Sequence, residues 1–279
     1  MTSSKDYIIN FSEKTLRSLF RENLFRYNLI NSIDRAELAD NHKLQSIYDS
    51  AKKLSYSATF IDSLIKHETP KTLYSKLRYD SYNSLNEFIR TKNILLAEFE
   101  RLKKSKSFIF STILLDLIPL SDLHNLKQYL RLAQKQLTRL KRSKRFKAVI
   151  SYFVIKYELS WTISNSAIYL LLHLHFILAV DNTLDNTIEA IRGIILKYFT
   201  NHISIDIQQV KSITRVTSYI LKSVDNAIFH ESKKFIVPPI YKLIVLSELK
   251  GFHLLTTSRN LNNTYKRRHT KNDLQIHHC

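Results

Sequence analysis

The sequence predicts an α+β fold, in which helices flank a central antiparallel or mixed sheet. From residue 108 onward, segments with the two-residue period of a strand alternate with segments that have the three-to-four-residue period of a helix. Two long β-rich segments, 148–161 and 168–180, follow one another without a helix between them. We expect them to pair as an antiparallel hairpin connected through 160–167, which argues against a purely parallel sheet.

The other expected elements follow in order along the chain. Apolar residues at helical spacing predict helices at 10–29, 34–65 and 86–104, so that 1–105 forms a helical N-terminal region. After residue 105 we expect a strand at 108–117, a helix at 123–143 and two strands at 148–161 and 168–180. A helix that ends at Tyr198, a strand at 203–210 and a helix at 214–223 follow. With the helical segments after Pro238 and Pro239, this central part is expected to span 106–257. Residues 258–279 are expected to form a basic, disordered tail.

Charge and composition narrow the class of protein. The chain has 279 residues, 44% of them hydrophobic, which is typical of a globular protein. Its 43 Lys and Arg against 24 Asp and Glu give a net charge of +19, which predicts a polyanionic partner, nucleic acid before a membrane surface. Gly193 and Gly251 are the only glycines and neither lies in a phosphate-binding loop, which argues against an NTP-driven motor or a dinucleotide site. The single cysteine, Cys279, excludes a disulfide framework and a cysteine-based zinc site.

The sequence does not have the apolar pattern of a membrane span or of a signal peptide. The longest uncharged apolar stretch, 167–180, is too short to span a bilayer and contains two histidines. The first residues do not form the long apolar core of a signal peptide. We therefore expect a cytoplasmic protein without a membrane partner.

The two histidines in that stretch, His173 and His175, are the strongest indication of a site. Side chains alternate between the faces of a strand, so both imidazoles should project from the same face. Neutral imidazole is the commonest metal ligand in proteins, and the pair could hold one divalent cation. The alternative interpretation is two histidines of the core or the sheet edge. A second element downstream, residues 216–222 around Tyr219, favours the metal site.

Five segments, taken in order, resemble the motifs of the replication initiators of small rolling-circle plasmids, within the His-hydrophobe-His (HUH) endonuclease superfamily. Residues 108–114 resemble the family's first strand motif, 139–147 its basic stretch, and 156–160 its acidic motif. His173-Leu-His-Phe-Ile-Leu resembles the metal motif. Residues 216–222 fit the tyrosine motif, hydrophobe-x-x-Tyr-hydrophobe-x-Lys, at every defined position. The resemblance covers about the middle 40% of the chain.

The resemblance implies a nicking and joining endonuclease that initiates replication at a single-stranded or hairpin plasmid origin, with a host helicase and polymerase as further partners. His173, His175 and Glu158 would hold Mg²⁺ or Mn²⁺. Tyr219 would attack the phosphate and form a 5′-phosphotyrosine, assisted by Lys222 on the same helical face. The basic stretch would contact DNA phosphates through Arg139, Lys141, Arg142, Lys144, Arg145 and Lys147.

The chemistry of the tyrosine adds one expectation. A phenol with a pKa of about 10 is a poor nucleophile at neutral pH, so nearby cationic charge should lower the pKa of Tyr219. Two alternatives stay open, a catalytically inert nucleic-acid-binding protein with the same fold and a transposase of the same superfamily. Relaxases usually carry the tyrosine before the histidine motif, so the order of motifs here argues against that class.

Overall fold

The computed structural model describes residues 27–28, 30–38, 41–53, 85–181, 187–222, 228 and 235–258. Most of the predicted helix at 10–29 and nearly all of the predicted tail lie outside these ranges. Within them, five strands form one open antiparallel sheet in the order β4-β1-β3-β2-β5. The strands are β1 (Lys106–Pro119), β2 (Ile150–Ser164), β3 (Ala167–Asp181), β4 (Ser204–Gln209) and β5 (Leu255–Thr257). The predicted α+β class with an antiparallel sheet is confirmed.

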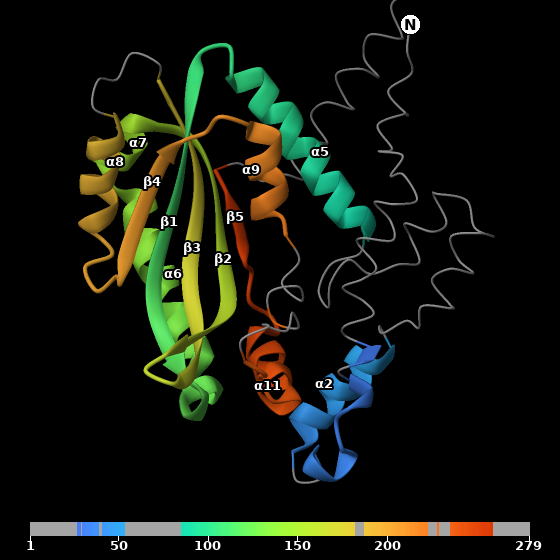
Figure 1. Ribbon diagram of the computed structural model, residues 1–279. Helices are drawn as coiled ribbons and strands as arrows, with labels where there is room; N and C mark the ends of the chain where they lie inside the picture. Colours follow the sequence, from blue (N-terminus) through green and yellow to red (C-terminus); the bar gives the residue numbers. More distant parts are fainter. Residues whose placement is uncertain are drawn as a thin grey trace, which may run out of the picture.

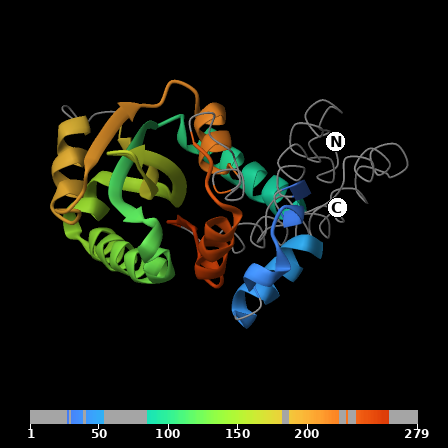
Figure 2. The same ribbon diagram turned by 60° about the horizontal axis from the view of Figure 1, so that its bottom comes forward.

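Helices cover the sheet on two sides, as Figures 1 and 2 show. One side carries α5 (Leu85–Leu102) and α9 (Ile213–Ile220), which pack on Phe108, Phe110, Val154 and Ile177. The other side carries α6 (Leu126–Arg142), α7 (Lys144–Val149) and α8 (Thr187–Leu196). Because side chains alternate along a strand, the odd-numbered residues of β3 from His173 to Ala179 face α5 and α9, and the even-numbered residues face α6.

The amphipathic pattern of α6 explains its place on the sheet. Its buried residues recur at a spacing of three to four, which puts them on one side of the helix, and they are Leu126, Leu130, Ala133, Leu137 and Leu140. They join the same core as the even-numbered residues of β3, among them Leu174 and Leu178. A short 3-10 helix, η2 (Leu120–Asn125), connects β1 to α6, so the predicted helix at 123–143 begins three residues later as an α-helix.

The remaining helices extend the core beyond the sheet. Helix α11 (Pro239–Leu249) begins with proline at its first position, where the missing N–H has no helical partner to lose. It contacts α2 (His42–Lys53), and the short helix η1 (Arg35–Leu38) lies before α2. Lys43 of α2 forms a 2.6 Å ion pair with Glu248 of α11. None of the described helices combines the length and the apolar character needed to cross a bilayer.

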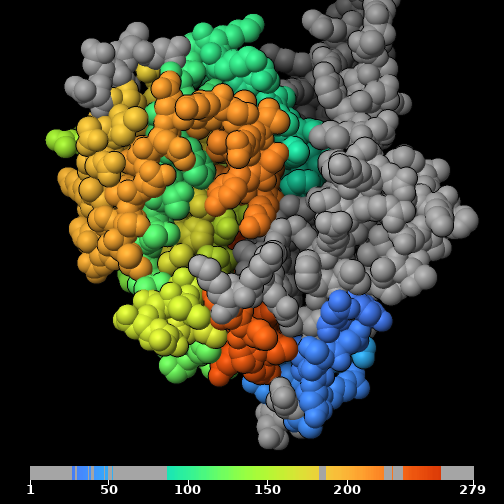
Figure 3. Space-filling model, viewed as in Figure 1, coloured from blue at the N-terminus to red at the C-terminus, as the bar shows by residue number. Residues whose placement is uncertain are grey.

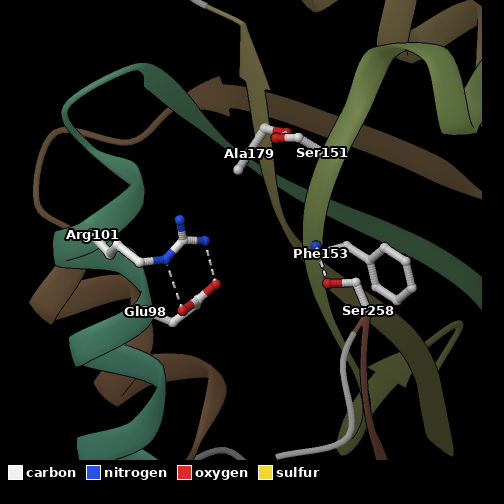
Figure 4. A network of polar contacts seen from close by, with 6 residues as sticks. All are labelled: Glu98, Arg101, Ser151, Phe153, Ala179 and Ser258. Carbon is white, nitrogen blue, oxygen red and sulfur yellow. Dashed lines mark hydrogen bonds and ion pairs between the residues drawn. The ribbon is translucent and has the colours of Figure 1, made fainter. Parts of the chain in front are cut away.

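Two short elements are not predicted by the sequence pattern. Helix α7 begins after Ser143, whose hydroxyl accepts a hydrogen bond from the backbone N–H of Phe146 at 3.1 Å. Strand β5 has only three residues, and its pairing with β2 is prolonged by Ser258 (Figure 4). The N–H of Phe153 donates to the Ser258 hydroxyl at 3.3 Å, and the N–H of Ser258 donates to the Phe153 carbonyl at 3.0 Å.

Figure 4 also shows two further sets of hydrogen bonds, one within α5 and one between β2 and β3. The buried carboxylate of Glu98 on α5 accepts two hydrogen bonds from Arg101, at 2.7 and 3.2 Å, which satisfies its charge beside the sheet. The hydroxyl of Ser151 donates to the carbonyl of Ala179 at 3.0 Å, where the β2–β3 register shifts.

The β2–β3 hairpin turns more tightly than the sequence predicts. The expected connection at 160–167 is wrong, because both strands continue to a two-residue turn at Asn165 and Ser166. Their φ angles of 48° and 62° are left-handed, as in the type I′ turn that suits the twist of a hairpin.

This turn gives a test of the fold. Ser166→Gly should raise the free energy of unfolding by up to about 1 kcal/mol, because glycine adopts a left-handed φ without the steric cost that serine bears. The control Ser164→Gly, in the extended β2, should lower it by about 0.5–1 kcal/mol. Urea denaturation followed by circular dichroism measures the free energy of unfolding of both variants. An equal loss of stability in the two would contradict the left-handed conformation of Ser166.

Candidate metal centre

Strand pairing brings the three predicted metal ligands together. In the β2–β3 register, Glu158 lies opposite His173 and Lys156 lies opposite His175. The two histidines are two residues apart on β3 and so share the face that carries α5 and α9. The sheet therefore presents one carboxylate and two imidazoles side by side.

The donor atoms of this triad lie close enough for one ion. One ligand atom from each of Glu158, His173 and His175 lies within 4.8 Å of the others. Glu158 Oε2 is 2.8 Å from His175 Nε2, and Glu158 Oε1 is 3.8 Å from His173 Nε2. All three residues are buried, with exposed fractions of 8%, 6% and 1% in chain order.

Several polar atoms of the triad lack a hydrogen bond among the described residues. These atoms are Glu158 Oε2, His173 Nδ1 and His175 Nε2. Glu158 Oε2 and His175 Nε2 lie 2.8 Å apart, a distance that forms an ion pair when the imidazole is protonated. A buried polar group without a partner is costly, and a divalent cation would satisfy the oxygen and the nitrogen at once. The arrangement fits a metal ion.

A threonine on β1 orients one of the ligands. Thr112 lies opposite His175 in the β1–β3 register, and its Oγ1 is 2.9 Å from His175 Nδ1. This contact allows Nδ1–H to donate to the threonine, which leaves the lone pair of Nε2 available to a metal. Burial lowers the pKa of His175 against the opposing attraction of Glu158, and a lowered pKa favours the neutral imidazole that metals bind.

The carboxylate is held in its charged form. Burial alone would raise the pKa of Glu158, but the attraction of His173 and His175 outweighs it and holds that pKa well below its usual range. Glu158 is thus negatively charged at neutral pH, as a carboxylate that holds a metal ion must be.

Tyr219 lies next to the triad. It belongs to α9, which begins after Ser212, whose hydroxyl accepts a hydrogen bond from the N–H of Arg215 at 3.4 Å. The Tyr219 ring centroid is 5.1 Å from that of His175 and 5.9 Å from that of Phe110, in edge-to-face contact with both. Its side chain is 44% exposed. In Figure 3, α9 covers only part of this face of the sheet, and strand atoms remain visible beside it.

The expected lowering of the Tyr219 pKa is wrong for the protein without an ion. Burial and the negative charge of Glu158 both raise the pKa of Tyr219 above the ordinary phenol value. The charge that acts on the ring is therefore that of a carboxylate rather than that of a cation.

Lys222 does not lie on the Tyr219 helix. The predicted helix at 214–223 ends earlier, at Ile220, so Lys222 follows the C-cap and does not share a helical face with Tyr219. A different lysine ties this segment to the sheet, since the ammonium of Lys156 donates a hydrogen bond to the Lys222 carbonyl. Lys156 is only 6% exposed and sits two residues from Glu158 on β2. A cation at a helix C-terminus is also favoured by the helix dipole.

The basic stretch lies on the other side of the sheet. Arg139, Lys141 and Arg142 end α6, and Lys144, Arg145 and Lys147 belong to α7. The buried residues of these helices, among them Leu140 and Phe146, pack with the even-numbered residues of β3. The structure thus separates these six basic residues from the triad, although the sequence suggests that they lie beside the hairpin.

Sequence reasoning misses two residues near the triad, Thr112 and Lys156. Both fall inside segments that resemble family motifs, and alternation places Lys156 on the same face as Glu158.

The chain matches no family model, no curated protein and no solved structure.

The threonine contact gives the prediction for this site. Thr112→Val keeps the side-chain shape but removes the hydroxyl that orients His175, so affinity for Mn²⁺ should fall by about 10–100-fold. Isothermal titration calorimetry on the purified chain measures the affinity. The control Thr162→Val, on β2 away from the triad, should leave it unchanged, and an equal loss in both variants would assign Thr112 a purely structural role.

Proposed function

We propose that this protein nicks and rejoins single-stranded DNA by a metal-dependent, tyrosine-mediated reaction, as an initiator of rolling-circle plasmid replication. The observation that carries the proposal is the contact between the Glu158, His173 and His175 triad and the ring of Tyr219, 5.1 Å from His175. A buried triad of metal ligands beside a half-exposed tyrosine supplies both parts that phosphodiester transfer needs. The role at a plasmid origin, with a host helicase and polymerase, rests on the resemblance of the motifs.

The ligand set suits a small divalent cation. One carboxylate with two imidazoles is compatible with Mn²⁺ and, with water completing the shell, Mg²⁺. When bound, the ion would supply positive charge to a scissile phosphate as negative charge builds on it. Glu158 and the two histidines would hold the ion, and Thr112 would keep His175 in the required tautomer.

The covalent step belongs to Tyr219. A bond forms between its phenolic oxygen and phosphorus, and the bond from phosphorus to the 3′ oxygen breaks. The phenol proton passes to solvent, and the leaving 3′ oxygen takes a proton from solvent to become a hydroxyl. The strand stays joined to the protein through a 5′-phosphotyrosine, and the reverse reaction rejoins the ends without ATP. Exposure of the tyrosine on one side gives DNA access to it.

The metal requirement is tested on the triad. His173→Ala and His175→Ala should each reduce covalent adduct formation by more than about 100-fold, because removing a ligand is worse than disturbing its orientation. The assay incubates the protein with Mn²⁺ and a random-sequence pool of single strands labelled at the 3′ end, and then separates the adduct on a denaturing gel. The exposed His124→Ala serves as the control, and excess chelator should abolish the signal. Full activity in chelator would remove the metal from the mechanism.

The tyrosine assignment has its own test. Tyr219→Phe removes only the phenolic oxygen, so DNA binding should persist while no adduct forms. Tyr198→Phe, at a tyrosine packed against the opposite face of the sheet, is the matched control and should form the adduct normally. Mass spectrometry of the unmodified protein locates the linkage. An adduct on another tyrosine would refute the assignment, and DNA binding without any adduct would instead indicate an inert nucleic-acid-binding protein.

A further inference from the structure

The outer face of α6 carries a regular row of positive charge. Arg131, Lys135, Arg139 and Arg142 are all exposed, and their spacing of four, four and three residues aligns them along one side of the helix. We call these four residues the α6 basic stripe. No acidic residue occurs in α6 or α7, so nothing within these helices neutralises the row.

The stripe has the dimensions of a nucleic-acid backbone. Arg142 lies eleven positions after Arg131, which corresponds to about 16 Å along an α-helix. Along the axis of a duplex, each strand places one phosphate about every 3.4 Å, so the row is as long as about five such steps.

The sheet separates the stripe from the metal centre. The opposite side of α6, through Leu130 and Leu137, packs on the even-numbered residues of β3, whereas His173 and His175 project from the other face. Figure 2 shows α6 on one side of the sheet and α9 on the other. A nucleotide held at the triad therefore cannot contact the stripe, and any DNA on the stripe is a different segment.

The chemistry of this surface favours duplex DNA over other partners. Proteins that bind single strands combine basic residues with exposed aromatic rings for base stacking, and α6 exposes no large aromatic residue. Helices that bind membranes insert their apolar side, but the apolar side of α6 is buried in the core. A rigid helix with cations at regular spacing and no exposed ring suits a backbone of regular phosphates.

We propose that the α6 basic stripe binds the phosphate backbone of a double-stranded DNA segment, separate from the strand at the Tyr219 site. The inference rests on the proposed function for the identity of that second strand. The protein would then hold two parts of one DNA at once, the duplex on α6 and the single strand on the opposite face of the sheet.

The experiment compares two variants of the full chain with equal change in charge. The stripe variant combines Arg131→Gln, Lys135→Gln, Arg139→Gln and Arg142→Gln. The control combines Lys103→Gln, Lys104→Gln, Lys211→Gln and Lys250→Gln, at exposed lysines outside the stripe. Thermal unfolding first establishes that both fold like the unmodified chain. Neutral glutamine is used because it keeps the helical propensity of α6.

Two measurements then separate the duplex from the scissile strand. Fluorescence anisotropy with a random-sequence duplex two helical turns long gives the dependence of log affinity on log salt. For the stripe variant this slope should become shallower by up to about 3.6, at about 0.9 for each phosphate that the protein no longer neutralises, and by less for the control. Adduct formation on random hexanucleotide single strands should be unchanged in the stripe variant.

Three results would overturn the inference. An unchanged salt slope would show that the duplex does not contact the stripe. Equal loss of duplex binding and of hexanucleotide adduct would show that the stripe holds the scissile strand. Loss of binding to vesicles of anionic lipid, with duplex binding intact, would make the surface a membrane contact. If the unmodified protein forms no adduct, the nicking proposal fails, while a shallower duplex slope in the stripe variant still supports duplex binding by α6.

Discussion

The pairing of β2 with β3 is the constraint on which the rest of the candidate site depends. Opposing residues of an antiparallel pair have their Cβ atoms about 4.5–5.5 Å apart, which is the distance at which Glu158 and His173 can share an ion. A slip of one residue would turn Glu158 to the opposite face and bury it against α6. The turn at Asn165 and Ser166 fixes the register, and the β1 strand repeats the constraint by placing Thr112 beside His175.

Much of the fold follows from local patterns, and the misses have physical causes. Alternation over 148–180 predicts the two central strands, and the helical period over 123–143 predicts α6. The sequence pattern misplaces the turn because residues 162–166 are largely polar and carry no glycine, so they resemble a longer loop. In the structure, asparagine and serine occupy the two left-handed positions of the turn. Strand β5 has three residues, and such a short strand is defined only by its partner.

For the site, the sequence predicts the ligands but not their surroundings. His173, His175 and Glu158 can be predicted because each carries a distinctive side chain in a strand of clear period. Thr112 and Lys156 are ordinary residues whose importance comes from the strand or carbonyl opposite them, which no local pattern specifies. The same limit applies to the basic stretch. Its positive charge can be seen in the sequence. The face of the sheet that α6 covers, however, depends on the path of the chain after β1, which the sequence pattern does not specify.

The unpartnered atoms of the triad have a consequence for folding as well as for the proposed chemistry. Without an ion, Glu158 Oε2 and His175 Nε2 are buried 2.8 Å apart with no other polar partner among the described residues, whereas both are hydrated in the unfolded chain. An ion that binds only the native triad therefore stabilises the fold by mass action, by about 2.7 kcal/mol when its free concentration is about 100 times its dissociation constant. With an ion bound, the triad would then add to the stability of the fold, by an amount that depends on the metal concentration of the surroundings.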